Sequence, residues 1–160
     1  MKIGVISDTH DRIDHLAKAL KMLRKGGVKV LIHCGDFCAP FMMEELAKFS
    51  GEVHCVFGNI DDRYNTPLKA RELGINFHGD LAELEFSGRK IAVNHYPKIA
   101  EALASVGLYD AVFFGHNHTA SKKCVGKTLL CNPGELMGRK GKLTFGIYDT
   151  DGNDVEIVEL

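Results

Sequence analysis

Residues 2–36 read KIGVISDTHDRIDHLAKALKMLRKGGVKVLIHCGD, and their pattern indicates the fold class. It opens with an apolar run at residues 2–7, which predicts a buried strand. Leu16, Leu20 and Leu23 then recur at the spacing of one helix face, and two glycines at 26 and 27 end that pattern. A second apolar run follows at residues 29–33. The order strand, helix, strand with short connections predicts two parallel strands covered by a helix.

The same alternation continues and then changes. Pro40 opens a predicted helix that Gly51 closes, and a third strand is expected at residues 52–57. A hairpin (81–86 and 90–94), a helix (99–106) and a strand (111–114) follow. Beyond residue 120 the pattern predicts an antiparallel meander without helices, with strands at 120–125, 127–131, 142–149 and 154–159. An α/β beginning and an antiparallel end favour two packed β-sheets with helices outside.

Composition limits the classes of protein to consider. The 160 residues form a single expected domain, 1–160, and 20 basic against 21 acidic residues leave a net charge of −1. This balance argues against a protein that binds long nucleic acid or a membrane surface by bulk charge. No apolar run can span a membrane, and Asp8 comes too early for a secretion signal. Five cysteines, mostly in apolar runs, predict reduced thiols and a cytoplasmic location.

Polar side chains directly follow five of the predicted strands. Loops at the carboxyl ends of strands in α/β sheets converge on one crevice, where ligands bind. We therefore expect these side chains to lie close together. In chain order they are Asp8, His10, Asp36, Asn59, His95, His116 and His118.

The residue types point to divalent metal ions. Carboxylate, imidazole and amide groups suit Mn²⁺, Fe²⁺, Zn²⁺ or Ni²⁺. Seven ligands are too many for one tetrahedral site, but they suffice for two ions if one carboxylate bridges them. Asp36 is the natural bridge because Gly35 before it allows a close approach. Two ions about 3.5–4 Å apart can hold a bridging hydroxide and clamp the oxygens of a displacement at phosphorus.

The ordered motif series resembles the calcineurin-like metallophosphoesterase superfamily. The series is Asp8-x-His10, Gly35-Asp36, Gly58-Asn59, His95 and Gly115-His116-x-His118. The short length and Asn132-Pro133-Gly134 are similar to its small branch, the YfcE-like and MJ0936-like phosphodiesterases. The resemblance implies a four-layer α/β/β/α sandwich of two mixed sheets flanked by helices. It assigns a first metal to Asp8, His10, Asp36 and His118. It assigns a second metal to Asp36, Asn59, His95 and His116.

The implied activity is hydrolysis of small phosphodiesters. A hydroxide bridging the two ions would attack phosphorus in line, and the ions with Asn59 would stabilise charge on the non-bridging oxygens. Asp36 would bridge the ions, and His10 would orient the nucleophile or the leaving group. Manganese is the first expectation for the metal, with nickel, iron, zinc or magnesium as alternatives. Members of the family also commonly form dimers or larger assemblies, so a homo-oligomer is an open alternative.

Two positions depart from the family pattern. Ile60 stands where the superfamily usually has a histidine that protonates the leaving group, although Asp61 keeps the acidic position after it. Losing a general acid favours esters with good leaving groups. Tyr96 follows the ligand His95, where the family often has glycine. Ile60 also motivates a different hypothesis, a non-catalytic scaffold that binds a protein partner. A phosphomonoesterase is a third hypothesis, but only Arg12 and Arg63 are obvious partners for a dianion.

The remaining candidates have simpler interpretations. Four other histidines are expected to be structural or surface residues: His15, His33, His54 and His78. Arg12 and Arg63 are expected in surface salt bridges rather than on a substrate phosphate. Cys34 and Cys38 flank Asp36 but are expected to pack rather than to bind metal. Asn132-Pro133-Gly134 is expected to be a structural turn near the site.

Overall fold

The first strand, β1 (Lys2–Ile6), shows why the chain builds layers. Successive side chains of a strand point to opposite faces of the sheet. Ile3 and Val5 belong to one buried cluster and Ile6 belongs to another, and all three are shielded from solvent. A strand that is apolar on both faces needs a covering layer on each side.

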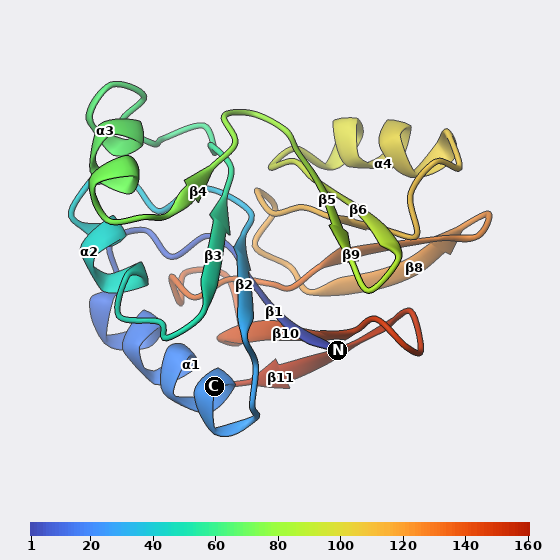
Figure 1. Ribbon diagram of the computed structural model, residues 1–160, viewed down its shortest axis with the longest axis horizontal. Coiled ribbons are helices and arrows are strands. Elements are labelled where there is room, and N and C mark those ends of the chain that lie inside the picture. Colours follow the sequence, from blue (N-terminus) through green and yellow to red (C-terminus); the bar gives the residue numbers. More distant parts are fainter.

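The computed structural model describes residues 1–160 and supplies these layers as two mixed β-sheets with helices outside them (Figure 1). The first sheet has the order β11-β10-β1-β2-β3-β4 and the second has the order β5-β6-β7-β9-β8. The first sheet contains, beside β1, the strands β2 (Val30–His33), β3 (Glu52–Cys55), β4 (Asn76–Phe77), β10 (Thr144–Asp149) and β11 (Asp154–Glu159). The second sheet contains β5 (Ala82–Phe86), β6 (Arg89–Val93), β7 (Ala111–Phe113), β8 (Ser121–Val125) and β9 (Thr128–Asn132). The helices are α1 (Ile13–Lys25), α2 (Met42–Leu46), α3 (Asn65–Glu72) and α4 (Pro97–Ser105).

Three buried apolar clusters fill the three contacts between the four layers. One cluster joins the first sheet to α1, α2 and α3, and it includes Leu23 of α1. The middle cluster lies between the sheets, where Val5 of β1 and Phe113 of β7 are buried. In the third, Ala104 of α4 packs with Val112 of the second sheet. This arrangement confirms the expected α/β/β/α sandwich.

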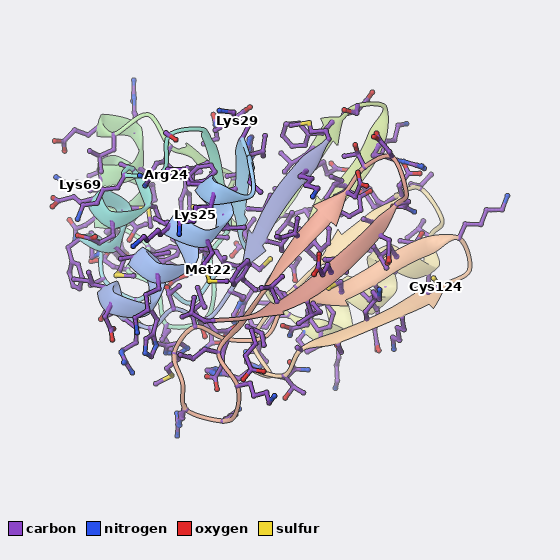
Figure 2. All side chains as sticks on the ribbon, turned by 90° about the horizontal axis from the view of Figure 1, so that it is seen from below. Met22, Arg24, Lys25, Lys29, Lys69 and Cys124 are labelled. Carbon is purple, nitrogen blue, oxygen red and sulfur yellow. The ribbon has the colours of Figure 1, made fainter.

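Helix α1 has the predicted amphipathic pattern. Leu16, Leu20 and Leu23 are buried on one side. Figure 2 shows Lys25 on the opposite, outward side of the helix, and Arg24 at its flank donates to the Lys48 carbonyl oxygen at 3.2 Å. The helix is therefore held by its apolar face against the first sheet. None of the four helices combines the length and the apolar character that crossing a membrane requires.

Parallel pairing brings the ends of several strands to the same edge. In the first sheet, β1, β2, β3 and β4 run parallel to one another. In the second sheet, β6, β7 and β9 also run parallel. The loops that leave the carboxyl ends of these strands therefore start from a common side of each sheet.

The structure corrects two expectations and adds two elements. The four strands after residue 120 do not form one meander: β8 and β9 are a hairpin in the second sheet, whereas β10 and β11 are a hairpin in the first. Moreover, β9 pairs in parallel with β7, and β10 pairs with β1. Helix α2 ends at Leu46, short of the predicted end at Gly51. Helix α3 and the two-residue strand β4 were not predicted.

Candidate metal centre

The loops after β1, β2, β3, β6 and β7 bring the seven sequence-predicted ligands into two overlapping groups. In each group the carboxylate oxygens and imidazole nitrogens lie within 4.8 Å of one another. Asp36 belongs to both groups. One group contains Asp8, His10, Asp36 and His118, and the other contains Asp36, His95 and His116. Asn59 joins the second group, because its Oδ1 lies 2.8 Å from His116 Nδ1 and 3.3 Å from His95 Nε2.

The first group is enclosed by protein. Asp8 is fully buried, and its Oδ1 lies 3.4 Å from His118 Nε2 and 3.9 Å from His10 Nε2. His10 Nε2 also lies 3.6 Å from Asp36 Oδ2. These distances are too long for good hydrogen bonds, and His10 Nε2 is a buried atom that makes no hydrogen bond. A buried polar atom without a partner is costly, and a metal ion would satisfy it.

The second group reaches the surface. Asp36 Oδ2 lies 3.3 Å from the Nε2 atom of His95, whose side chain is fully buried. Asn59 and His116, in contrast, are exposed. The ring of Tyr96 packs close to two of these histidines, with its centroid 5.3 Å from that of His95 and 5.4 Å from that of His116. Solvent therefore reaches the second group at Asn59 and His116.

Hydrogen bonds at the far ring nitrogens orient two of the histidines toward the centre. Nδ1 of His95 lies 2.8 Å from the carbonyl oxygen of Cys34, and Nδ1 of His118 lies 2.6 Å from Glu135 Oε2. Because these oxygens only accept, each Nδ1 carries the proton and donates. In the neutral ring, Nε2 then presents a lone pair toward the oxygens of Asp36 and Asp8. A cation between such atoms removes their repulsion, so the donor set fits divalent metal ions.

The backbone of these loops adopts the left-handed conformation at most candidate ligands. This conformation costs free energy for residues other than glycine and concentrates at functional sites. Hydrogen bonds between loops hold it, since Asp8 N–H donates to Gly35 O and His10 N–H donates to Asp36 O, both at 3.0 Å. The positive φ values are 51° at Asp8, 42° at His10, 60° at Asp36, 73° at His116 and 61° at His118.

Two glycines are required by the close approach of loops from different strands. A Cβ atom at Gly58 would lie 2.0 Å from Asp36 Oδ1. A Cβ atom at Gly115 would lie 2.0 Å from Ser7 Oγ and 2.6 Å from Asp8 Oδ2. No side chain fits at these distances. Steric crowding therefore requires glycine at both positions, in the Gly-Asn motif and in the Gly-His motif.

The structure explains why Asp61 is present without the usual histidine before it. Its carboxylate accepts hydrogen bonds from the N–H groups of Gly58 at 2.6 Å, Cys38 at 2.8 Å and Asp36 at 3.0 Å. Burial raises the pKa of Asp61, and although these N–H groups oppose the shift, its pKa stays above its usual value. Ile60 itself donates only its backbone N–H, to Asp36 Oδ1 at 3.2 Å. Asp61 thus joins two ligand loops, and Ile60 offers no side-chain proton.

The charges at the centre favour cations. Burial raises the pKa of Asp36, but His95, the N–H of Ile60 and His10 outweigh it, so the pKa lies below its usual value. For His95, burial lowers the pKa and the Asp36 carboxylate raises it, with a net rise. Asp36 is therefore ionised at neutral pH and available to a metal ion.

The other histidines have structural partners. His33 accepts a hydrogen bond from the Gly35 N–H at Nδ1 (3.1 Å), so its Nε2–H donates to Thr9 Oγ1 (3.0 Å). Burial lowers the pKa of His33 to about 3, which keeps the ring neutral. His15 bonds to the Leu136 carbonyl oxygen. His54 lies between Glu52 and His78, 2.9 Å from each.

The two arginines are engaged in ion pairs. Arg12 Nη2 lies 3.1 Å from Asp14 Oδ2. Arg63 contacts both oxygens of Asp80, at 2.6 and 3.3 Å, and stacks over the ring of Phe57. Both side chains therefore form the surface salt bridges that the sequence predicts.

The contacts of the cysteines and of the Asn-Pro-Gly turn are structural as well. All five cysteines are free, and burial raises the pKa of Cys34 and Cys38, so both are neutral thiols at neutral pH. Asn132 Nδ2 donates to the Gly115 carbonyl oxygen at 2.9 Å and to Asn117 Oδ1 at 2.7 Å. The turn therefore braces the loop that carries His116 and His118.

Glu135 is a buried carboxylate at the centre that the sequence analysis did not identify. It lies three residues after β9 and is fully buried. Burial raises the pKa of Glu135, but His118 and two backbone N–H groups outweigh it and leave the pKa below its usual value. The signal that could have found it is its position after a strand that ends at the same edge as β7.

Comparisons with known proteins agree with this geometry. A model of the calcineurin-like phosphoesterase superfamily domain matches residues 1–153. The phosphodiesterase MJ0936 of Methanocaldococcus jannaschii is 32% identical to the chain, and the match covers 100% of this chain and 99% of the relative. A solved structure described as a novel archaeal phosphodiesterase superposes with a TM-score of 0.93 at 30% identity, over 100% of both chains. The Escherichia coli phosphoesterase YfcE shares the fold, with a TM-score of 0.73 at 17% identity over 99% of this chain and 98% of the other.

Proposed function

The chain belongs to the calcineurin-like phosphoesterase superfamily, and on that premise we propose that it is a phosphodiesterase that uses two divalent metal ions to hydrolyse small phosphodiesters. The observation that carries the proposal is the position of Asp36. This buried carboxylate is common to both ligand groups, and a shared carboxylate is what a pair of neighbouring ions requires. The relative MJ0936, named as a phosphodiesterase, supports the choice of substrate class.

The proposed ligands are those that the motifs predicted. Asp8, His10, Asp36 and His118 would hold one ion, and Asp36, Asn59, His95 and His116 would hold the other. Bound there, two divalent ions supply a nucleophile from water at neutral pH and offset negative charge on the phosphate oxygens. We take manganese as the first candidate, with nickel, iron, zinc and magnesium as alternatives.

The positions of three side chains around the centre indicate their roles toward the substrate. Asn59 is exposed beside His116, so its amide contacts a phosphate that enters from the open side. His10 lies between Asp8 and Asp36 and orients the groups that react at phosphorus. Ile60 is 44% exposed at the rim and transfers no proton. The proposed enzyme therefore favours diesters with good leaving groups.

The surroundings favour a diester over a monoester. A dianionic monoester gains more from additional cations near the metal ions. The two arginines next to the ligand loops are each paired with an aspartate, Arg12 with Asp14 and Arg63 with Asp80. Both guanidinium groups already pair with a carboxylate, and we take this as support for the phosphodiesterase.

Two further proposals concern the whole chain. We propose that residues 1–160 act as one metallophosphoesterase domain, because all three apolar clusters are shared between elements distant in sequence. We also propose a cytoplasmic location. Its support is that all five cysteines are free, as expected in a reducing compartment.

Metal removal followed by metal addition tests the proposed function. The full chain is stripped with a chelator, supplied with Mn²⁺, and assayed with bis-p-nitrophenyl phosphate and p-nitrophenyl phosphate. We expect metal-dependent release from the diester and little release from the monoester. Release mainly from the monoester would identify a phosphomonoesterase. No release from either, with two ions bound, would overturn the proposal in favour of a scaffold that binds a protein partner.

A further inference from the structure

Glu135 connects the candidate metal centre to a loop that carries no candidate ligand. Its Oε2 accepts the Nδ1–H of His118 at 2.6 Å. Its Oε1 accepts the backbone N–H groups of Lys140 at 2.5 Å and Gly141 at 3.0 Å. Both carboxylate oxygens are therefore used, each as an acceptor, and the side chain is fully buried.

The loop bonds fix where the carboxylate lies. The backbone of Glu135 is also held in place. Its carbonyl oxygen accepts the Thr144 N–H at 3.0 Å, and it forms an isolated β-bridge with Leu143. The carboxylate thus has a set position before any ion binds. His118 rests against it with Nε2 directed at Asp8 Oδ1, 3.4 Å away.

A comparison with His95 shows what the carboxylate adds. His95 is oriented in the same way, but its Nδ1–H donates to the neutral carbonyl of Cys34. A carboxylate partner fixes the tautomer of a ligand histidine and also raises its basicity as a ligand. The buried charge of Glu135 has no Lys or Arg partner, since its contacts are backbone N–H groups and His118. Burying such a charge is expensive unless it has a role.

We propose that Glu135 is a positioning residue that holds His118 in the Nδ1–H tautomer, with Nε2 directed at the ion that Asp8 and Asp36 also bind. The inference rests on the proposed function, because it takes His118 as a metal ligand. Glu135 does not touch the ion or the substrate. It acts on metal affinity through His118.

The test variant is Glu135→Gln. Glutamine is neutral, so His118 loses its anionic partner in either orientation of the amide: the amide nitrogen cannot accept the Nδ1–H, and the amide oxygen accepts it without a charge. Loss of such a partner typically costs roughly 10–100-fold in metal affinity, and we expect this for Mn²⁺. Calorimetric titration of the metal-free full chain with Mn²⁺ measures it. Glu135→Asp keeps the charge on a shorter side chain, and we expect it to restore part of the affinity.

Lys140→Gly tests the loop apart from the histidine. Glycine keeps the N–H that donates to Glu135 and adds backbone freedom to the loop, while the carboxylate–histidine pair and the Gly141 bond keep their groups. We expect Mn²⁺ affinity to stay within about threefold of wild type. A loss as large as that of Glu135→Gln would overturn the proposal, because it would show that loop packing alone sets the affinity. Wild-type affinity in Glu135→Gln would overturn it equally.

The tautomer of His118 in the wild type gives a readout that depends neither on bound metal nor on the folding of a variant. The ¹⁵N chemical shifts of its ring in the metal-free wild type distinguish protonation at Nδ1 from protonation at Nε2. We expect Nδ1–H in wild type and a changed pattern in any Glu135→Gln protein that circular dichroism shows to be folded. Protonation at Nε2 in wild type would overturn the inference. Failure of wild type to bind any of Mn²⁺, Ni²⁺, Fe²⁺, Zn²⁺ and Mg²⁺ would overturn the proposed function instead.

Discussion

The two halves of the candidate centre differ in charge and in exposure. The half formed with Asp8 and His118 is buried and contains, with Asp36, two carboxylates. The half formed with Asn59 and His116 is open to solvent and shares only the carboxylate of Asp36. Electrostatic attraction for a cation is stronger in the buried, more negative half. Under the proposed function, we therefore expect the buried half to bind its ion more tightly and the open half to be the side from which the substrate enters.

Asp36→Asn has the largest expected effect, because Asp36 belongs to both halves. We expect Mn²⁺-dependent hydrolysis of bis-p-nitrophenyl phosphate to fall by roughly 1,000-fold, about 4 kcal/mol of transition-state stabilisation. The measurement is kcat/KM at saturating Mn²⁺, with circular dichroism as the control for folding. Activity within tenfold of wild type would show that Asp36 does not bridge two metal ions.

A paired comparison sharpens the difference between the halves. Asp8→Asn removes a charge from the buried half, and Asn59→Ala removes a neutral ligand from the open half. We expect Asp8→Asn to weaken the tighter Mn²⁺ binding step by about 100-fold and Asn59→Ala to weaken the other step by about tenfold. Calorimetric titration resolves the two steps. Equal effects on both steps would mean that the halves are energetically alike.

Ile60→His tests whether a histidine in the open half can act as a general acid. A well-placed acid contributes about 10²–10⁴-fold, but we expect a gain of only about tenfold. The reason is that the Asp61 carboxylate, which would orient the histidine, already accepts three backbone N–H groups. The gain is measured on a dialkyl phosphodiester relative to bis-p-nitrophenyl phosphate, with Ile60→Gln as the control. An equal gain with glutamine would exclude proton transfer as its cause.

Gly115→Ala tests how tightly the loop of the second sheet is held against Asp8 of the first. The added Cβ meets Ser7 Oγ at 2.0 Å and Asp8 Oδ2 at 2.6 Å, so we expect the free energy of unfolding to fall by about 1–3 kcal/mol. Urea unfolding of the metal-free chain measures it. Gly152→Ala is the matched control, because a Cβ there meets nothing within 4 Å. A stability loss shared by both variants would point to a general effect of removing glycine.

Much of the centre could be predicted because strand ends are visible in the sequence. Apolar runs locate the strands, and a polar residue directly after each run marks the edge where the loops meet. His118 and Asp36 lie 82 positions apart in the numbering, yet the expectation that both reach one crevice needed only the direction of the strands. The predicted hairpin around Gly88 is also present, between β5 and β6.

What could not be predicted depends on pairing between distant segments. The run at 127–131 has the same pattern whether it neighbours β8 alone or also β7, and only the parallel pairing with β7 directs its end to the centre. Glu135 was missed for this reason. Helix α3 was missed because it buries only Thr66 and Ala70 and has little apolar periodicity. Its position is set by packing rather than by local pattern.

The pairing of β1 with β10 has a consequence for synthesis on the ribosome. Lys2 lies opposite Asp149, so one edge of β1 has its native partner only after residues 144–149 have emerged. Until then the nascent chain exposes that edge, and open edges invite pairing with other chains. We expect the first sheet to be completed late, when nearly the whole of residues 1–160 has left the exit tunnel. The order of synthesis therefore leaves this edge of β1 unpaired for most of translation.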